Sequence, residues 1–348
     1  MHYGWVGKNL EVNLSSGKSH TTAVDPAARA MYLGGRGTNT KLFWDRIPPE
    51  TDSYSSGNLL VFGTGVLTGT PAPGANRTIL TTLSPQTNLQ TYSSLGGFWG
   101  AQLKQAGYDN LIISQKSSKP VYLWINNDRV EIRDAGHLWG TDIREATKII
   151  RDELTQSSVQ VLSIGQAGEN RVQAATIEHG SGTGASRAGV GAVMGDKKLK
   201  AIAVCGSKDI HIARPAAFHE LCENILKKTD GIRAYFDRIS YETQEWFMNN
   251  WAWGNMDEKR PFDNAGKCHE DFVKEFSSRT ESCYNCALAC KVNIKLPEGE
   301  YCSVKCQSWF SFMFAVKTPD LLFNARCTNL CEKYGLDTIS TACNIAFA

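Results

Sequence analysis

Residues 121–134 read VYLWINNDRVEIRD, a stretch that predicts a β-hairpin. Its two halves, VYLWI and VEIRD, are rich in β-branched and aromatic residues and flank the polar residues 126–128. Asn and Asp tolerate the backbone angles of tight turns, so strand-forming runs around them are typical of a hairpin. The run LEVNL, followed by Ser-Ser-Gly at residues 15–17, shows a similar pattern near the N-terminus.

Further strands are predicted between and after these hairpins. Short apolar runs bounded by Gly, Pro or Asn are typical of buried strands. The clearest helix is REATKIIRDEL at residues 144–154, because its apolar residues recur at helical spacing. The first part of the chain is therefore predicted to be a mixed α+β domain with substantial sheet. The predicted strands are NLLVFG, RTILTTLS, NLIIS, VQVLSIG and LKAIAVCG.

The second part of the chain has a different texture. Residues 216–229 and 318–335 predict amphipathic helices, the second of them ended by Gly335. The chain has 11 cysteines, and none precedes Cys205. We therefore predict an α+β domain at residues 1–209 and the start of a mainly helical domain at residues 210–348.

The composition argues against several classes of function. The 348 residues are 42% hydrophobic and carry a formal net charge of +2, which indicates neither a nucleic-acid surface nor an acidic tail. No apolar run approaches the roughly 20 residues of a membrane-spanning helix. No export signal is visible, which predicts a cytoplasmic protein with reduced thiols. The apolar stretch at residues 339–348 lacks a helix stop signal, so a fragment of a longer protein is expected.

Glycine-rich loops are the first candidate site. They occupy residues 34–39, 63–78, 93–100 and 182–195. Such loops expose backbone N–H groups that can bind phosphate, although sheet domains also need glycine simply for turns. Arg77 and Arg187 lie near glycines in two of these loops, which suggests a large ligand with several phosphates.

The second candidate site is the run TESCYNCALACKV. It places Cys283, Cys286 and Cys290 in a C-x2-C-x3-C spacing. This spacing fits a [4Fe–4S] cluster whose fourth ligand lies far away in the sequence. Zinc is the alternative, and it would need a second unit, such as Cys302 with Cys306 or Cys327 with Cys331. The last pair is four residues apart on a predicted helix, where buried thiols are common.

With these two sites identified, the whole chain resembles the aldehyde ferredoxin oxidoreductase family. The stretches GTGVLTGTPAPGANRT, SRAGVGAVMGDKKLKAIAV and SCYNCALAC carry the resemblance, together with KYGLDTIS. It implies a tungsten bis-pterin cofactor beside a [4Fe–4S] cluster, held by an N-terminal pair of sheets and closed by helical domains. Within the family, LGGRGTNTKLFWDRIPPE and YLWINNDRVEIRDA look closer to the tungsten-containing active-site subunit of class II benzoyl-CoA reductase.

The resemblance also implies roles for particular residues. Arg77 matches an arginine that contacts a pterin phosphate. The second phosphate loop supplies a backbone carbonyl to a bridging Mg²⁺. Ser94 stands where the aldehyde enzymes have an asparagine that binds this Mg²⁺, so that ligand is changed here. The remaining implied cofactor contacts are Gly96 and Gly97, the loop residues Arg187, Ala188 and Gly189, and the pterin-ring motif Glu332, Gly335, Leu336 and Asp337.

Two features of the catalytic region follow from the same resemblance. Cys306 lies in GEYCSVKCQSW, in a Lys-Cys context like that of the benzoyl-CoA subunit's tungsten-ligating cysteine. A soft thiolate ligand suits tungsten. The benzoyl enzyme's His and Glu proton donors have no counterpart in EWFMNNWAWGN, which offers Phe247 and Trp251 instead. The fourth cluster ligand is expected in a C-terminal region beyond this chain.

The predicted function is that of the active-site chain of a tungsten-pterin, [4Fe–4S] oxidoreductase. It would transfer electrons between an organic substrate, either an aldehyde/carboxylate pair or an aromatic acyl-CoA, and a ferredoxin or small iron–sulfur subunit. A homodimer or a hetero-oligomer is expected. The alternatives are a benzoyl-CoA reductase-type dearomatising subunit and, in another class, a non-catalytic iron–sulfur or zinc module.

Overall fold

The fold is described from a computed structural model that covers residues 3–156, 158–180, 183–229, 231–232, 265–304 and 310–348. The described strands form two six-stranded sheets and one three-stranded sheet. The strands are β1 (Lys8–Asn13), β2 (Lys18–Ala23), β3 (Leu60–Thr64), β4 (Thr78–Leu83), β5 (Gln90–Leu95), β6 (Asn110–Ser114), β7 (Val121–Asn126), β8 (Arg129–Asp134), β9 (Gln160–Ser163), β10 (Ile177–His179), β11 (Gly184–Ala185), β12 (Leu199–Cys205), β13 (Ser277–Glu281), β14 (Lys291–Lys295) and β15 (Tyr301–Val304).

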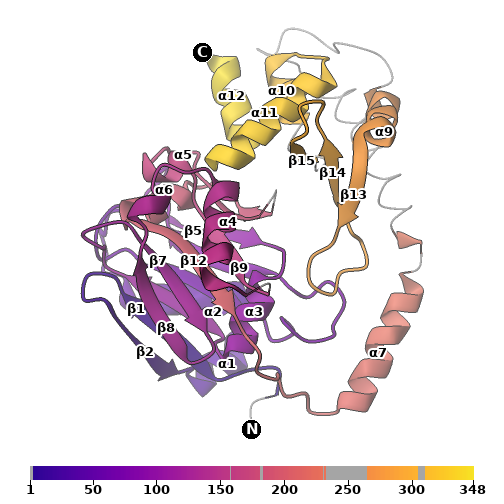
Figure 1. Ribbon diagram of the computed structural model, residues 1–348. Helices are drawn as coiled ribbons and strands as arrows, with labels where there is room; N and C mark the ends of the chain where they lie inside the picture. The colour runs from indigo at the N-terminus through magenta and orange to yellow at the C-terminus, as the bar shows by residue number, and fades with distance from the viewer. Residues whose placement is uncertain (1–2, 157, 181–182, 230, 233–264, 305–309) are drawn as a thin grey trace.

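Helices cover the outer faces of the two large sheets and make up much of the C-terminal part (Figure 1). The helices are α1 (Pro26–Tyr32), α2 (Gly35–Arg46), α3 (Trp99–Ala106), the 3-10 turn η1 (Gly136–Leu138), α4 (Ile143–Leu154), α5 (Gln166–Glu169), α6 (Val190–Asp196), α7 (Pro215–Lys228), α9 (Ala265–Phe276), α10 (Phe310–Val316), α11 (Leu321–Tyr334) and α12 (Thr338–Phe347).

The first large sheet has the strand order β2-β1-β6-β3-β4-β5. The pairing of β1 with β6 is parallel, and the other neighbours run antiparallel. The hairpin predicted around residues 15–17 is confirmed as β1 and β2, which pair from Lys8 with Ala23 to Asn13 with Lys18. Strand β5 is an edge of this sheet, so one side of it remains open to other parts of the chain.

The second large sheet has the order β11-β10-β9-β12-β7-β8. The predicted VYLWI and VEIRD strands are confirmed as β7 and β8, joined by a turn in which Asn126 pairs with Arg129. Asn127 has a left-handed φ of 52°, a conformation that Asn tolerates better than most residues. The polar residues at this turn therefore have the role that the sequence assigns to them.

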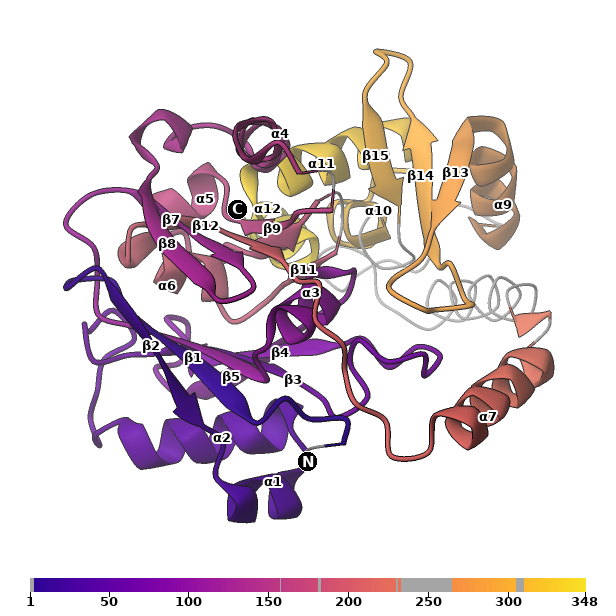
Figure 2. The same cartoon turned by 60° about the horizontal axis from the view of Figure 1, so that its bottom comes forward.

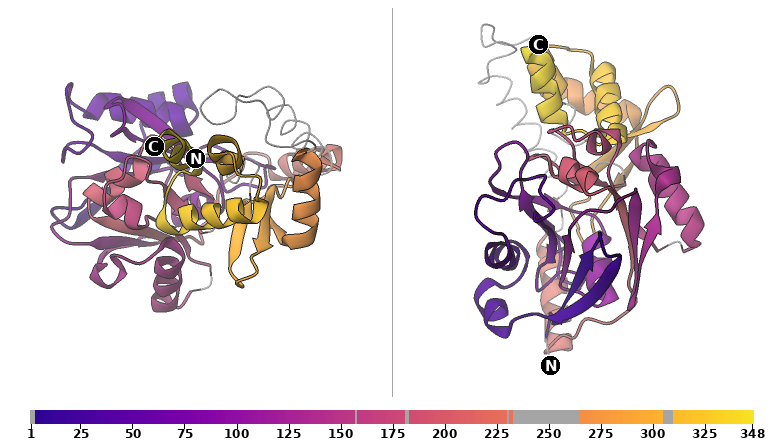
Figure 3. Two further views of the ribbon diagram at one scale, coloured as in Figure 1. Left: turned by 90° about the horizontal axis from the view of Figure 1, so that it is seen from above. Right: turned by 90° about the vertical axis from the view of Figure 1, so that its left-hand side faces the viewer.

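The main core lies between the two large sheets. Figure 2 shows α3 in the gap between them, with one sheet on either side, and Figure 3 gives the same layers from two further directions. Trp99 of α3 is fully buried, and its indole N–H donates to the Ile202 carbonyl of β12 at 3.1 Å. Its ring also lies 5.4 Å from that of Phe62 on β3, so one side chain bridges both sheets.

Each large sheet has a second apolar layer on its outer face. Phe43 of α2 packs with Val61 and Ile112 of the first sheet. Ile150 of α4 packs with Trp124 of the second sheet, in the helix that periodicity predicts. Burial on both faces explains why the central strands read as nearly continuous apolar runs.

The C-terminal part adds a small sheet to the helices that the sequence predicts. Helices α7 and α11 confirm the two amphipathic segments, and Gly335 ends α11 in a left-handed conformation. The antiparallel sheet β13-β14-β15 is an addition, because the expectation for this region is mainly helical. Two of its strands, SSRTE and YCSV, lack the apolar runs from which the strands of the large sheets are predicted. The overall class, α+β with two sheets followed by helices, is confirmed.

Candidate cofactor site

The cysteine-rich loop at residues 283–290 docks onto the glycine-rich loops of the first sheet. The backbone N–H of Tyr284 donates to the Gly97 carbonyl at 3.1 Å. The side chain of Asn76 donates to the Tyr284 carbonyl at 2.6 Å, and the Tyr284 hydroxyl donates to the Gly69 carbonyl at 3.2 Å. One residue next to the first cysteine thus contacts two separate glycine loops.

Asn285 extends this contact to residues 71–74. The Gly74 N–H donates to the Asn285 carbonyl at 2.8 Å, and the Asn285 side chain donates to the Pro71 carbonyl. The ring of Tyr284 also meets the ring of Phe98 edge-on, with centroids 6.0 Å apart. These hydrogen bonds join residues more than 200 positions apart in the sequence, and no local pattern could predict them.

Gly96 is the point where the predicted cluster ligands and the predicted phosphate loop meet. A Cβ atom placed on Gly96 would lie 2.9 Å from the sulfur of Cys283 and 3.7 Å from a guanidinium nitrogen of Arg77. Real Cβ atoms essentially never approach a neighbour within 3.0 Å. Glycine at this position therefore leaves room for both the thiol and the guanidinium to approach the same point of the backbone.

The thiols of this loop suit a polynuclear cluster. Cys283, Cys286 and Cys290 are free and half-buried, and the Cys286 N–H donates to the Cys283 carbonyl at 3.2 Å. No three His, Cys, Asp or Glu side chains of the described residues are arranged to hold one metal ion. A [4Fe–4S] cluster does not need such convergence, because each thiolate binds its own iron. The C-x2-C-x3-C spacing remains the observation that predicts the cluster.

Three other described cysteines of the helical part lie in surroundings that disfavour the thiolate form. Cys302 is fully buried and donates to the Ala325 carbonyl at 3.4 Å, and burial raises its pKa well above the usual value. Burial also raises the pKa of Cys331 to about 12 and raises that of Cys327. Burial of these thiols opposes formation of the thiolate that metals bind. Cys306 lies outside the described residues.

The predicted second phosphate loop joins the two large sheets. The Ser93 hydroxyl of β5 donates to the Ser186 carbonyl at 2.6 Å, and the Ser84 hydroxyl donates to the Ala188 carbonyl at 2.9 Å. Arg187, Ala188 and Gly189 all have positive φ, at 66°, 55° and 67°. Consecutive left-handed residues are costly for non-glycine side chains, so this loop is held by its surroundings. The Ala188 carbonyl keeps a second lone pair for another donor or a cation.

Arg77 and Arg187 share an unusual environment. Both side chains are exposed, and neither forms a hydrogen bond or an ion pair within the described part of the chain. Most charged side chains at a protein surface can find a partner nearby, so an exposed guanidinium next to a glycine loop is available for an external anion. This environment is compatible with the predicted phosphate binding.

Gly97 brings the two sheets together on the other side of the cysteine loop. It has a φ of 87°, and a Cβ atom there would collide with the ring of His179 on β10. His179 is buried, and its Nε2 atom lies 2.8 Å from the Gln160 Oε1 atom. The sequence places His179 beside a glycine-rich loop, but only the fold places it against Gly97. Ser94, two residues from Gly96, lies half-buried on β5.

The predicted pterin-ring motif spans the end of helix α11 and the link to α12 and contacts residues 174–176, in the segment before β10 of the second sheet. The Thr176 N–H donates to the Gly335 carbonyl, and the Asp337 N–H donates to the Ala174 carbonyl, both at 2.8 Å. Between them, Leu336 forms an isolated antiparallel bridge with Ala175. The motif therefore lies at a junction between the two parts of the chain.

Two carboxylates of this motif have structural partners that the sequence does not reveal. Glu332 accepts from Arg144 of α4 at 2.8 Å and is buried. Asp337 caps helix α12, since its Oδ1 atom accepts from the Ser340 N–H at 2.7 Å. Their contact with a pterin ring stays a prediction.

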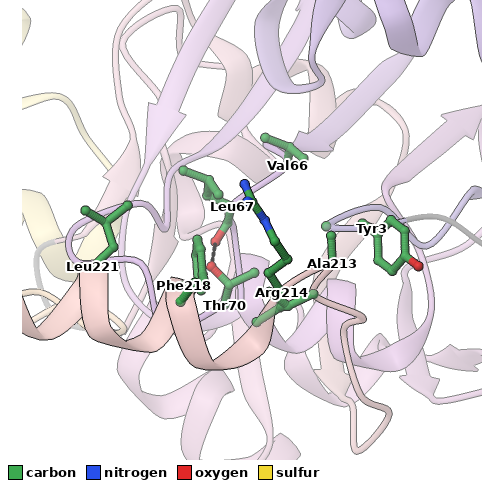
Figure 4. A pocket seen from close by; sticks show the side chains of 11 residues that line it. Tyr3, Val66, Leu67, Thr70, Ala213, Arg214, Phe218 and Leu221 are labelled. Carbon is green, nitrogen blue, oxygen red and sulfur yellow. Dashed lines mark hydrogen bonds between the residues drawn. The ribbon is translucent and has the colours of Figure 1, made fainter.

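A cavity of about 300 Å³ lies elsewhere, between the start of α7 and the loop after β3 (Figure 4). Its walls are mainly apolar, with Phe218 and Leu221 on α7 and Val66 and Leu67 on the loop. Figure 4 shows the Arg214 side chain turned toward Val66 and Leu67. None of the predicted site residues lines this cavity, so it is separate from the candidate cofactor site.

Comparison with known proteins agrees with this arrangement. A family model described as "Aldehyde ferredoxin oxidoreductase, N-terminal domain" matches residues 9–206. A second, "Aldehyde ferredoxin oxidoreductase, domains 2 & 3", matches residues 228–348. In the described part of the chain, no helix is both long and apolar enough to cross a membrane.

Curated relatives extend the same likeness. The tungsten-containing aldehyde ferredoxin oxidoreductases of Thermococcus kodakarensis and Pyrococcus furiosus are each 35% identical over 99% of this chain. The match covers 58% of each relative, so the chain spans little more than half of their length. A shorter match, 37% identical over 59% of the chain, is the "Aliphatic sulfonate oxidoreductase, WOR-like subunit" of Pyrococcus furiosus.

Among solved structures, one chain of the "Active site complex BamBC of Benzoyl Coenzyme A reductase in complex with 1,5 Dienoyl-CoA" is similar over the whole fold. The TM-score is 0.93 and the sequence identity is 41%. The match covers 100% of this chain and 55% of that one.

Proposed function

Because the chain belongs to the aldehyde ferredoxin oxidoreductase family, we propose that it forms the cofactor-binding part of a tungsten-pterin, [4Fe–4S] oxidoreductase. One observation carries this proposal. Gly96 brings the sulfur of Cys283 and the guanidinium of Arg77 together, although they are about 200 residues apart in sequence. A cluster and a phosphate-bearing cofactor bound by these residues would be neighbours, as electron transfer between them requires.

Each part of the site has a proposed role. Arg77 and Arg187 would bind phosphates of the pterin cofactor, and the Ala188 carbonyl would be available to a Mg²⁺ ion. Cys283, Cys286 and Cys290 hold three irons of the cluster. When bound, the tungsten-pterin group exchanges electron pairs with the organic substrate, and the cluster passes electrons singly to a ferredoxin-type carrier.

The surroundings of Cys283 suit this task. The bound thiolate is anionic, and a guanidinium close to it stabilises that charge. Tyr284 and Asn285 fix the loop through hydrogen bonds to four backbone groups of the glycine loops, three carbonyls and one N–H. A rigid attachment matters because the distance between two redox groups sets the rate of transfer between them. The loop is held by backbone groups, and the thiols themselves remain free for iron.

Metal and cofactor analysis of the full-length protein tests the proposal. Anaerobically purified protein should contain tungsten, pterin and about four irons with four labile sulfides per chain. Arg77→Ala and Arg187→Ala should lower tungsten and pterin together while iron is retained. Arg214→Ala is the matched control, because Arg214 is also exposed but lies at the separate cavity. Unchanged tungsten in both loop variants would refute the phosphate role.

A second candidate, reduction of an aromatic acyl-CoA, has one specific observation in its favour. The benzoyl-CoA reductase chain is 41% identical over the entire chain, against 35% for the aldehyde enzymes. Under this candidate, Cys306 ligates tungsten through its thiolate. Tungsten-edge X-ray absorption on wild type and Cys306→Ser decides between the candidates. The number of sulfur ligands should fall by one in the variant, and an equal number in both favours the aldehyde type.

The partners of the proposed enzyme follow from its electron chemistry. A ferredoxin or a small iron–sulfur subunit would accept electrons from the cluster, and a homodimer or hetero-oligomer in the cytoplasm is expected. The solved relative is described as part of an active-site complex, and another relative as a subunit, which supports a multi-subunit assembly. If the chain were instead a non-catalytic zinc module, metal analysis would give about one zinc and no tungsten.

A further inference from the structure

Arginines without a protein partner are concentrated around strand β5. Among the described arginines, those with neither a hydrogen bond nor an ion pair are Arg36, Arg77, Arg187 and Arg214. Arg214 lies at the cavity beside α7. The other three approach the same edge strand from different segments of the chain, and Arg36 has no role in the proposed function so far.

Arg36, Arg77 and the Arg187 loop each approach β5 at a different residue of the strand or just after it. Arg77 lies beside Gly96, directly after the strand. Arg187 follows Ser186, whose carbonyl accepts from the Ser93 hydroxyl at 2.6 Å. The guanidinium of Arg36 lies 4.1 Å above the centre of the Tyr92 ring. Successive strand residues advance about 3.3 Å, so the Arg36 and Arg77 contacts are separated by roughly 13 Å along β5.

Tyr92 holds the Arg36 guanidinium without using its N–H groups. A cation over a ring face is attracted to the ring electrons, and the donors at the edge of the guanidinium stay free. The Tyr92 side chain is 50% exposed and Arg36 is exposed, so a ligand can reach the pair. Tyr92 and Ser94 also share one face of β5, because side chains alternate along a strand.

We propose that Arg36, held on Tyr92, is a third phosphate contact of the candidate cofactor site. This inference rests on the proposed function, in which Arg77 and Arg187 bind phosphate. Arg77 meets β5 just past its end at Gly96, and the Arg187 loop meets it at Ser93. A long polyanionic ligand that follows the strand from Arg77 would reach Tyr92 next, and Arg36 supplies a counter-charge there. The ligand class is a phosphate monoester or diphosphate.

Two sources would present this chemistry. One is a phosphate of the resident pterin cofactor, and the other is a phosphate of a coenzyme A thioester substrate. The sources differ in what a variant loses. If Arg36 contacts the cofactor, removal of the guanidinium lowers tungsten and pterin content. If it contacts a thioester substrate, cofactor content is unchanged and coenzyme A binds more weakly.

The test uses anaerobically purified full-length protein in four forms: wild type, Arg36→Gln, Arg36→Lys and Tyr92→Leu. Tungsten, pterin and iron are measured per chain, and the dissociation constant of free coenzyme A is measured by calorimetry. We expect Arg36→Gln to lower either cofactor content or coenzyme A affinity about tenfold or more, the effect of losing a charge-assisted pair of hydrogen bonds. Arg36→Lys keeps the positive charge but lacks the planar N–H donors of the guanidinium, so its effect should be smaller than that of Arg36→Gln. Tyr92→Leu should cost about two- to fivefold.

Controls separate this inference from the proposed function. Arg214→Gln removes another exposed, unpaired arginine and should change neither quantity. Wild-type protein without tungsten and pterin refutes the proposed function itself. Wild-type protein that holds its cofactor, with Arg36→Gln equal to it in cofactor content and in coenzyme A binding, refutes the role of Arg36 alone.

Discussion

The joint between the two sheets and the candidate cofactor site both depend on cationic side chains, and they use them in opposite ways. Lys197 is fully buried, and its ammonium donates to the carbonyls of Asn58 at 2.5 Å and Gln115 at 3.1 Å. Arg77 and Arg187 are exposed and have no partner within the described residues. A buried cation whose N–H groups have carbonyl partners stabilises the two-sheet part of the chain, which we call the frame. An exposed cation without such partners remains available to a ligand.

Other buried lysines of the frame follow the same rule. Lys200 donates to the Thr141 carbonyl at 2.9 Å and pairs with Glu169 at 2.5 Å. Lys104 donates to the Gly65 carbonyl at 2.5 Å and lies 3.8 Å from Asp109. Burial lowers the pKa of both Lys104 and Lys197 to about 8. Each of these lysines connects segments that are far apart in the sequence, and the following variants test the contrast between this frame and the site.

The largest effect is expected in the site, from Cys283→Ser. Loss of one thiolate should reduce the iron content of full-length protein from about four per chain to nearly none. The free energy of unfolding of the two-sheet part should change by less than about 0.5 kcal/mol, since Cys283 is half-buried and outside the main core. Iron analysis and denaturant unfolding measure the two quantities. Cys343→Ser, at an exposed cysteine of α12, is the control and should keep its iron. Full iron in Cys283→Ser would contradict the cluster assignment.

The junction between the two parts of the chain should respond next. A Cβ atom on Gly165 would overlap the Tyr334 carbonyl and lie 2.9 Å from the Lys333 carbonyl, both at the end of α11. Gly165→Ala should therefore destabilise the junction by about 1–3 kcal/mol, measured by hydrogen exchange of α11 and α12. Gly57→Ala is the control, because its Cβ atom would meet nothing closer than 3.5 Å. Equal hydrogen-exchange rates of α11 and α12 in both variants would show that the close approach of Gly165 to Tyr334 does not stabilise the junction.

Within the frame, Lys197→Met should cost about 1–2 kcal/mol. The variant leaves the carbonyls of Asn58 and Gln115 without a donor, and relief from burying a charge offsets part of that loss. Lys198→Met is the matched control, because the neighbouring Lys198 is exposed and donates to the Ser118 carbonyl at 2.7 Å. Chemical denaturation of both variants at pH 7 provides the comparison. If Lys198→Met lowered the free energy of unfolding as much as Lys197→Met, the buried hydrogen bonds of Lys197 would not be the source of the effect.

The smallest effect is a pH dependence of the frame. Folding lowers the pKa of Lys197 from about 10.5 to about 8, so the unfolded chain binds more protons between these values. Stability must then rise as the pH increases through this window, by roughly 1 kcal/mol between pH 8 and pH 9 for this group. The difference in unfolding free energy between wild type and Lys197→Met should grow accordingly. A difference that shrinks or stays constant from pH 8 to pH 9 would contradict the lowered pKa.

Local patterns in the sequence predicted part of the two-sheet region and two helices of the C-terminal part, but not helix α3, whose Trp99 bridges the sheets. The hairpins around residues 15–17 and 126–128 and helices α4, α7 and α11 were predicted where the structure has them. These elements have short turns, clear periodicity or a terminal glycine, all of which act within a few residues. The small sheet β13-β14-β15 was not predicted, because SSRTE and YCSV lack the apolar runs that mark strands of the same length in the large sheets.

Particular site residues show where sequence reasoning stops. The C-x2-C-x3-C spacing and the arginines of two glycine loops marked the site, and a third loop with the same composition contained Arg36. The sequence could not distinguish Arg36 from a solvated surface cation, because its contact with Tyr92 joins segments 56 positions apart. It also gave no sign that Glu332 pairs with Arg144 or that Asp337 caps α12.

The sequence by itself determined the α+β class, the family resemblance and the residue types available for iron and phosphate, because these depend on composition, periodicity and local spacing. Only the tertiary structure decided which of these residues meet. Gly96 brings Cys283 against Arg77, and Gly97 lies against His179, because each lacks a side chain at a crowded crossing of distant segments. Close approach of this kind depends on the packing of two sheets around one core, and no window of the sequence contains it.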